Sequence, residues 1–250
     1  MRLHTRLSNM LRVAELAFRE DAAVEAEGTL AGKDGIVLIH GLCGTPRTLR
    51  PLRRSLQRSF ERPMLEIRLG LGLGDIRDMA TRVDDLLVER EIRRCDVVAY
   101  SMGGLVAAHL LKCLDQGRRI RRVVTLGTPH QGIALASEGW LRATGLFRSL
   151  AQMRVGSNFL RQLRRIPMPR GTQIVSIAGA ADLIVPVESA RVAEHGCRNL
   201  VIPGIDHWGL LLSRRVFRCA GRALQRDHLE PHLDPSEFPG LAAAPLRLAG

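Results

Sequence analysis

The sequence predicts an α/β fold in which a doubly wound, mostly parallel sheet lies between layers of helices. Short apolar runs rich in β-branched residues recur along the chain from Gly35, and segments with helical patterning separate most of them. Strands that are apolar at every position are typical of a parallel sheet covered on both faces. Right-handed crossovers between parallel strands then place helices on both sides of the sheet. One long interval without a strand interrupts this alternation and predicts a helical cap.

The predicted elements follow one another in chain order. Apolar runs predict strands at 36–40, 64–69, 96–100, 122–126, 173–179 and 199–204. Helical patterning predicts helices at 47–60, 75–91, 102–114, 188–194 and 208–224. Because strands and helices alternate, most of these helices are expected to connect two parallel strands.

The chain is predicted to divide into an extension, a domain and a tail. Residues 1–30 form an N-terminal helical extension with amphipathic patterning, and 31–225 form the α/β domain. Within this domain, residues 131–171 hold about two predicted helices and form a cap or lid over the site. Residues 226–250 carry four prolines without clear periodicity, which predicts a loosely packed C-terminal tail.

The formal net charge of +12 is the unusual feature of the composition, and arginine carries nearly all of the positive charge because Lys33 and Lys112 are the only lysines. Such a balance invites the hypothesis of a nucleic-acid or anionic membrane partner. Aromatic residues make up only 4% of the chain and no nucleic-acid motif occurs, so we expect no nucleic-acid partner. Arginine clusters at 118–122 and 161–170 leave peripheral contact with anionic lipid open.

The cysteines and the N-terminal segment indicate the cellular compartment in which the protein is expected. The five cysteines are widely spaced and include no CxxC pair, which predicts reduced thiols and neither a disulfide framework nor a zinc site. Residues 1–20 lack the uninterrupted apolar core of a secretory signal, and no stretch of the chain approaches the roughly 18 uncharged apolar residues of a membrane span. We therefore expect a soluble cytoplasmic protein without a bound metal.

The segment DVVAYSMGGLVAAHLL places Ser101 between a buried strand and an apolar helix. A serine on such a tight turn exposes its hydroxyl, and the free N–H groups of the helix N-terminus stabilise negative charge beside it. Gly103 supplies the small residue that the turn needs two positions later, whereas Ala99 stands where the pattern G-x-S-x-G has glycine. Ser101 is therefore the predicted nucleophile, and the competing interpretation is a serine that simply caps a buried helix.

An activated serine needs a base and an acid that orients the base. Asp182 follows the predicted strand 173–179, and His207 follows the predicted strand at 199–204. The carboxyl ends of parallel strands meet at one edge of the sheet, where such folds place their sites. Asp182 is thus the predicted acid and His207 the predicted base, in the chain order Ser, Asp, His.

Several residues compete with these for the same roles. Asp206 adjoins His207 and is the rival acid, although a side chain seldom folds back onto its neighbour's ring. Cys43 is a weak rival nucleophile because no histidine is arranged beside it in the sequence. The rival bases are His40, His109, His130 and His195.

The predicted oxyanion donors are two backbone N–H groups, since acyl transfer develops negative charge on the carbonyl oxygen. One is that of Met102, the residue after the nucleophile. The other is that of Leu42, in the loop after the first strand, where Gly41 and Gly44 let the backbone fold tightly. The alternative interpretation is a plain strand-to-helix turn, with Thr45 and Pro46 at the start of the helix, and both can hold together.

Taken together, these segments resemble the α/β-hydrolases, and more narrowly the small bacterial triacylglycerol lipases and esterases of the minimal type. The motifs that carry the resemblance are IVLIHGLCGTP, DVVAYSMGGLVA, VVTLGTPHQG, AGAADLIVPVESA and VIPGIDHWGLLLS, within residues 35–224. The resemblance implies the same three catalytic residues and the same two oxyanion donors. The similar lipases commonly have alanine at the position of Ala99, and they usually have histidine where this chain has Tyr100. The interval 131–171 is longer than the cap of the minimal lipases, and their secreted members carry a signal sequence that is not found here.

The cap interval contains two of the few aromatic residues, Trp140 and Phe147, interleaved with arginine. They are predicted to line an acyl pocket or to meet a lipid surface. A third possibility is that they belong to helices that bury an apolar face on the domain.

The predicted activity is hydrolysis of a small-molecule or lipid ester through an acyl-enzyme, with no cofactor. Two competing functions keep the same residues or the same fold. An acyltransferase or lipid deacylase would use the same residues: the acyltransferase would let an alcohol replace water, and the deacylase would act on the acyl group of a lipid. A catalytically silent member of the fold would instead serve as a binding module.

Overall fold

The structure is a computed structural model of the chain and describes residues 5, 8–13, 34–134 and 148–225. A six-stranded sheet forms its centre, with the order β2-β1-β3-β4-β5-β6 and with every neighbouring pair parallel. The chain reverses its direction of winding between β1 and β3, as in a doubly wound fold. The strands are β1 (Asp34–Ile39), β2 (Met64–Ile67), β3 (Arg94–Tyr100), β4 (Ile120–Leu126), β5 (Gln173–Gly179) and β6 (Arg198–Ile202). The α/β prediction is confirmed, with a sheet that is wholly parallel among the described residues.

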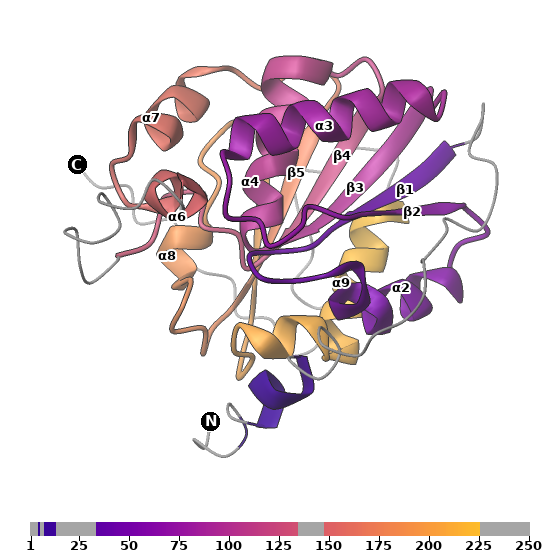
Figure 1. The fold of residues 1–250 in the computed structure, drawn as a ribbon. Helices are drawn as coiled ribbons and strands as arrows, with labels where there is room; N and C mark the ends of the chain where they lie inside the picture. The colour runs from indigo at the N-terminus through magenta and orange to yellow at the C-terminus, as the bar shows by residue number, and fades with distance from the viewer. Residues whose placement is uncertain (1–4, 6–7, 14–33, 135–147, 226–250) are drawn as a thin grey trace.

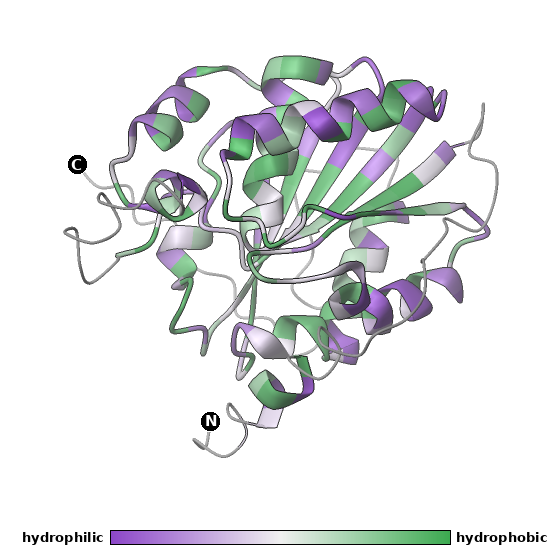
Figure 2. Ribbon diagram, viewed as in Figure 1, coloured by the Kyte–Doolittle hydropathy of each residue, from purple (hydrophilic) through white to green (hydrophobic). Residues whose placement is uncertain are grey.

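Alternate residues of each strand enter two separate cores, one on each face of the sheet. In β1, Val37 and Ile39 pack on the first face, whereas Ile36 and Leu38 pack on the second. Because both faces are covered, the strands are largely apolar, as Figure 2 shows. The register aligns Ile39 with Ala99 of β3, so these strands end together at one edge of the sheet.

Helices cover both faces of the sheet (Figure 1). The first face is covered by α3 (Ile76–Glu89), α4 (Met102–His109), η2 (Leu110–Asp115), α6 (Arg148–Met153), α7 (Asn158–Arg165) and α8 (Val187–Ala190). The second face is covered by η1 (Pro46–Leu49), α2 (Arg50–Gln57), η3 (Trp208–Leu211) and α9 (Arg214–Gln225). The carboxyl ends of the strands are left to the loops, which carry the site.

Four predicted helices differ from the observed ones, and the first of them, 47–60, is divided into η1 and α2. The predicted helix 188–194 is only the short α8, because both backbone groups of Val192 bond the side chain of Asn199 and the chain runs extended from Arg191. The predicted helix 208–224 is divided into η3 and α9. The predicted helix 102–114 begins as α4 and continues as the π-helical η2.

The predicted cap lies only partly within the described residues. The two described helices of the interval 131–171 are α6 and α7, and their Met153, Phe159 and Leu160 join the core of the first face. Residues 135–147, and with them the predicted substrate contacts Trp140 and Phe147, lie outside the described residues.

The two ends of the chain are also described only in part. Of the predicted extension 1–30, residues 8–13 are helical, and Val13 packs into the core of the second face. The predicted tail 226–250 lies outside the described residues. Among the helices that the structure describes, none combines the length and apolar character needed to cross a bilayer.

Candidate functional site

Ser101 lies at the carboxyl edge of the sheet, between the end of β3 and the start of α4. Its backbone has φ 52° and ψ −126°, a conformation that costs about 1–3 kcal/mol for a residue with a side chain. Although Ser101 directly precedes the helix, its hydroxyl makes no capping hydrogen bond. The interpretation of Ser101 as a simple helix-capping serine is therefore wrong, and the hydroxyl is available for another partner.

Two glycines let the helix approach the sheet closely enough to form this turn. A Cβ added to Gly103 would collide with the carbonyl oxygen of His40 at the end of β1. A Cβ added to Gly104 would collide with Oγ1 of Thr128, whose hydroxyl donates to the carbonyl oxygen of Ser101 at 2.9 Å. Gly103 and Gly104 are therefore required, because the helix backbone lies too close to His40 and Thr128 to leave room for a side chain.

Ser101, His207 and Asp182 form one hydrogen-bonded series. Nε2 of His207 lies 3.1 Å from Oγ of Ser101, and Nδ1 of His207 lies 2.7 Å from Oδ2 of Asp182. The other carboxylate oxygen of Asp182 accepts hydrogen bonds from the backbone N–H groups of Ile184 and Val185, at 2.9 and 2.8 Å. Because an ionised carboxylate only accepts, it places the proton of the neutral imidazole on Nδ1 and leaves Nε2 to accept from the serine.

The loop that carries His207 is held by neighbouring strands. The hydroxyl of Tyr100, at the end of β3, donates to the carbonyl oxygen of His207 at 3.2 Å, and the two rings lie 5.0 Å apart. Burial raises the pKa of Tyr100 well above its ordinary value, so the phenol stays protonated as a donor. Gly127, which follows β4, leaves room for the imidazole, since an added Cβ would lie 3.1 Å from its Nδ1.

The predicted oxyanion donors are Leu42, in the loop after β1, and Met102, in the first turn of α4. An added Cβ on Gly41, next to Leu42, would lie 3.0 Å from the Cβ of Ser101, so this loop passes directly beside the serine. Within the part of the chain that the structure describes, the N–H groups of Leu42 and Met102 have no hydrogen-bond acceptor, whereas that of Cys43 is bonded. Two unoccupied donors beside a nucleophile are suited to stabilise an oxyanion.

His40 supports this loop and does not contact the serine hydroxyl. Its Nε2 accepts from the backbone N–H of Leu69 at 3.0 Å, and its Nδ1 donates to the carbonyl oxygen of Gly41 at 2.8 Å. Burial lowers the pKa of His40, which keeps the ring neutral and suited to one donated and one accepted bond. Sequence reasoning identified His40 only as a rival base, and its supporting role is visible only in three dimensions.

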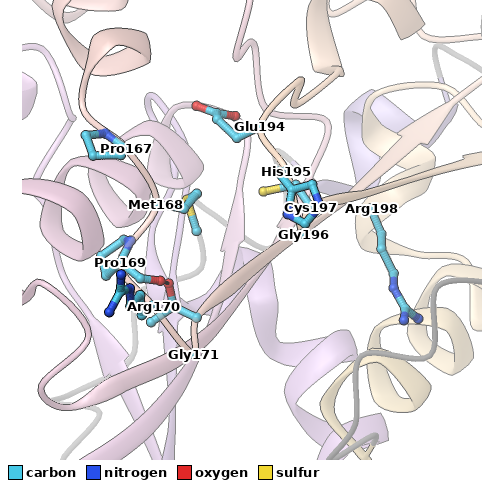
Figure 3. Close-up of a pocket in the computed structure, with 11 residues that line it drawn as sticks. Pro167, Met168, Pro169, Arg170, Gly171, Glu194, His195, Gly196, Cys197 and Arg198 are labelled. Atoms are coloured by element: carbon cyan, nitrogen blue, oxygen red, sulfur yellow. Dashed lines mark hydrogen bonds between the residues drawn. The ribbon is translucent and has the colours of Figure 1, made fainter.

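The remaining rival bases, His109, His130 and His195, have other neighbours than Ser101 among the described residues. His130 is buried, and burial lowers its pKa to about 3. His109 lies on α4 with its ring 5.8 Å from that of Phe159. His195 lines a cavity of about 690 Å³ between the loops that precede β5 and β6 (Figure 3). Because the strands are parallel, this cavity lies at the edge of the sheet opposite to the serine.

The contacts of Asp206 and Cys43 differ from those expected of the acid and the nucleophile. Asp206 directs its Oδ1 to the backbone N–H of Gly209 at 2.6 Å, so the carboxylate at the imidazole of His207 is that of Asp182. Cys43 is exposed, and among the described residues its thiol has no hydrogen bond to a histidine.

Three supporting residues were not predicted from the sequence. Tyr100 and Thr128 bond the backbones of His207 and Ser101, and Asn9 donates to the carboxylate of Asp206 at 3.2 Å. The sequence held a signal for Tyr100, the only tyrosine of the chain, because it directly precedes the serine. No local pattern could have identified Asn9, which is 197 positions away from its partner.

The site therefore combines a strained serine, an imidazole within hydrogen-bond distance of its hydroxyl, a carboxylate that orients the imidazole and two unoccupied backbone donors. These parts are sufficient to deprotonate the hydroxyl during attack on a carbonyl carbon and to stabilise the resulting oxyanion.

Comparisons with known proteins agree with the fold. The sequence matches the alpha/beta hydrolase family over residues 36–240. The structure is similar to the mature lipase BlEst2 of Bacillus licheniformis, with 21% identity and a TM-score of 0.61 over 80% of this chain and 96% of that one. It is also similar to a carboxylesterase of the thaumarchaeon Nitrososphaera gargenis, with 14% identity and a TM-score of 0.58 over 77% of this chain and 90% of that one. The RedJ thioesterase of Streptomyces coelicolor has 24% identity and a TM-score of 0.53, over 82% of this chain and 98% of that one. At these identities the structural similarity shows the fold.

Proposed function

Because the chain belongs to the alpha/beta hydrolase family, we propose that it is a serine hydrolase that cleaves carboxylic esters through an acyl-enzyme. The observation that carries the proposal is the hydrogen-bonded series from Ser101 through His207 to Asp182. The structural neighbours named as a lipase, a carboxylesterase and a thioesterase support an acyl compound as substrate.

In the first half of the reaction, Nε2 of His207 takes the proton of the Ser101 hydroxyl while Oγ attacks the ester carbonyl carbon. The N–H groups of Leu42 and Met102 donate to the oxyanion that forms. The carboxylate of Asp182 stabilises the imidazolium through its Nδ1–H. The imidazolium then gives its proton to the leaving alkoxide oxygen, the ester C–O bond breaks and an alcohol departs, which leaves an acyl-serine.

In the second half, the same groups act on water. Nε2 of His207 takes a proton from a water molecule as its oxygen attacks the acyl carbon. The second oxyanion collapses, the acyl–Oγ bond breaks, and the proton returns to the serine. A carboxylic acid leaves, and the enzyme is restored without any cofactor. If an alcohol replaces water in this half, the same residues give an acyltransferase.

The test of this function is a set of p-nitrophenyl esters from acetate to palmitate, an acyl thioester, and labelling with a fluorophosphonate. We expect turnover of esters and one equivalent of label on Ser101, located by peptide mass spectrometry. Product analysis with a competing alcohol separates hydrolysis from acyl transfer. A chain that takes up no label and turns over no ester would instead be a catalytically silent binding module.

We further propose that the site opens onto an anionic lipid surface. Leu71 is 64% exposed, and its carbonyl oxygen bonds the N–H of Cys43 in the loop after β1. Leu183 is 74% exposed and directly follows Asp182. Two loops of the site therefore carry an exposed apolar side chain, which is suited to insertion among lipid chains, and the net charge of +12 favours anionic headgroups.

Leu71→Ser and Leu183→Ser are expected to weaken binding to phosphatidylglycerol vesicles by about tenfold each, because each removes the burial of one leucine side chain. Hydrolysis of soluble p-nitrophenyl acetate should stay within about twofold, since neither side chain contacts the series. Val88→Ser is the matched control, because Val88 is 62% exposed at the far end of α3. Sedimentation with vesicles measures the effect. Equal binding of all variants, or equal binding to phosphatidylcholine, contradicts the proposal.

A further inference from the structure

The loop that carries His207 is closed by the carboxylate of its neighbour, Asp206. Oδ1 of this buried side chain accepts the backbone N–H of Gly209 at 2.6 Å, and the carbonyl oxygen of Asp206 accepts that of Leu210 at 3.2 Å. These bonds form the turn that leads into η3 and set the backbone of His207 at φ −53° and ψ −50°. The position of the imidazole therefore depends on a carboxylate that does not touch it.

A segment from the opposite end of the chain holds this carboxylate. Nδ2 of Asn9 donates to the same oxygen, Oδ1 of Asp206, at 3.2 Å. Residues 8–13 are helical and lie against the η3 and α9 region in Figure 1. Val13 is buried in the same core as Leu210 and Leu211 of η3, so the segment is anchored by apolar packing as well as by its hydrogen bond.

The contact is tightly packed. A Cβ added to Gly209 would lie 2.7 Å from Oδ1 of Asp206 and 3.5 Å from Nδ2 of Asn9. The three residues thus meet at one point beneath the turn, with no room for a further methyl group.

From this meeting point we infer that residues 8–13 brace the loop of His207, with Asn9 and Asp206 as positioning residues for the reaction. The bracing segment, residues 8–13, lies outside residues 36–240, over which the chain matches the family. The inference rests on the proposed function, because it assigns these residues to the alignment of His207 with Ser101.

The physical basis is the alignment that proton transfer requires. The bond from Nε2 of His207 to Oγ of Ser101 is 3.1 Å, and a small displacement of the loop lengthens it. A donor on a carboxylate forms a charge-assisted bond, which is stronger than a bond between neutral groups. Loss of Asn9 therefore loosens the turn and lowers the rate of the chemical step, with little effect on substrate binding.

Asn9→Ala is expected to lower kcat on p-nitrophenyl butyrate by about three- to tenfold and to leave KM within about twofold. Arg12→Ala is the matched control, because Arg12 is exposed on the same helical segment and should leave both constants unchanged. Melting curves of both variants must stay cooperative. A wild-type kcat for Asn9→Ala overturns the inference.

A pair of charge variants tests the contact itself. Asn9→Asp places two carboxylates against each other and is expected to lower kcat by more than about tenfold. Combining it with Asp206→Asn leaves a single carboxylate at the contact, because the new amide is uncharged and its oxygen can still accept from Gly209. The double variant should therefore have a kcat at least about threefold above that of Asn9→Asp. A double variant no better than Asn9→Asp overturns the inference.

Labelling distinguishes the failure of this inference from failure of the proposed function. Each variant is treated with a fluorophosphonate before its turnover is measured. If wild-type turnover does not depend on Ser101, the proposed function fails. If turnover depends on Ser101 but not on Asn9, the function stands and the brace is wrong.

Discussion

Replacement of Ser101 with alanine is expected to lower kcat/KM for soluble p-nitrophenyl esters by about 10⁴-fold or more. In the proposed reaction, the hydroxyl is the only group in the series that forms a bond to the acyl carbon. The unoccupied N–H groups of Leu42 and Met102 remain in the variant, so a small residual rate from oxyanion stabilisation is expected above that in water.

The measurement is initial-rate hydrolysis by purified protein, with fluorophosphonate labelling in parallel. Cys43→Ala is the matched control, because this cysteine is exposed in the loop beside the serine and shares a positive φ of 52° with it. The control should keep its label and its rate to within about threefold. Loss of activity in the cysteine variant with retention in Ser101→Ala would assign the nucleophile to the thiol and refute the proposal.

Ser101→Ala also has a structural consequence. The residue keeps a side chain at φ 52°, so the strain of the turn remains and melting temperature should change little. A cooperative transition near that of the wild type shows that the lost activity comes from the missing hydroxyl.

Asp182→Asn is expected to lower kcat by about 10³- to 10⁴-fold without unfolding the chain. The amide oxygen can still accept from the backbone N–H groups of Ile184 and Val185. The NH₂ group then faces Nδ1 of His207 and requires it to be an acceptor. The proton of the neutral imidazole moves to Nε2, which can no longer accept from Ser101.

Asp206→Asn provides the contrast for this experiment, because both carboxylates are buried and near His207. Its amide oxygen can still accept from Gly209, so we expect a loss of no more than about tenfold in kcat. The two variants are compared in the same ester assay. A loss for Asp206→Asn as large as that for Asp182→Asn would mean that charge at Asp206, and not its hydrogen bond, supports the histidine.

The features that the sequence predicted correctly have local causes. Apolar β-branched runs identified the regions of all the observed strands, because a strand covered on both faces must be apolar at nearly every position. The segment SMGG identified the turn at Ser101 because only small residues fit between α4 and the end of β1. The ends of helices were predicted less well. The helix at 188–194 stops early because the side chain of Asn199 bonds the backbone of Val192, a contact that periodicity does not contain.

The sequence by itself determined the parallel α/β fold and the order of Ser101, Asp182 and His207 at the ends of its strands, because strand patterning and the residues at strand ends are local properties. Only the tertiary structure decided which carboxylate meets the imidazole and what holds the histidine loop. Asp182 and Asp206 both lie in loops at the same edge of the sheet, and hydrogen bonds to Val185 and Gly209 direct them to different partners. The contact from Asn9 joins positions 197 residues apart, and packing of the folded chain alone brings them together.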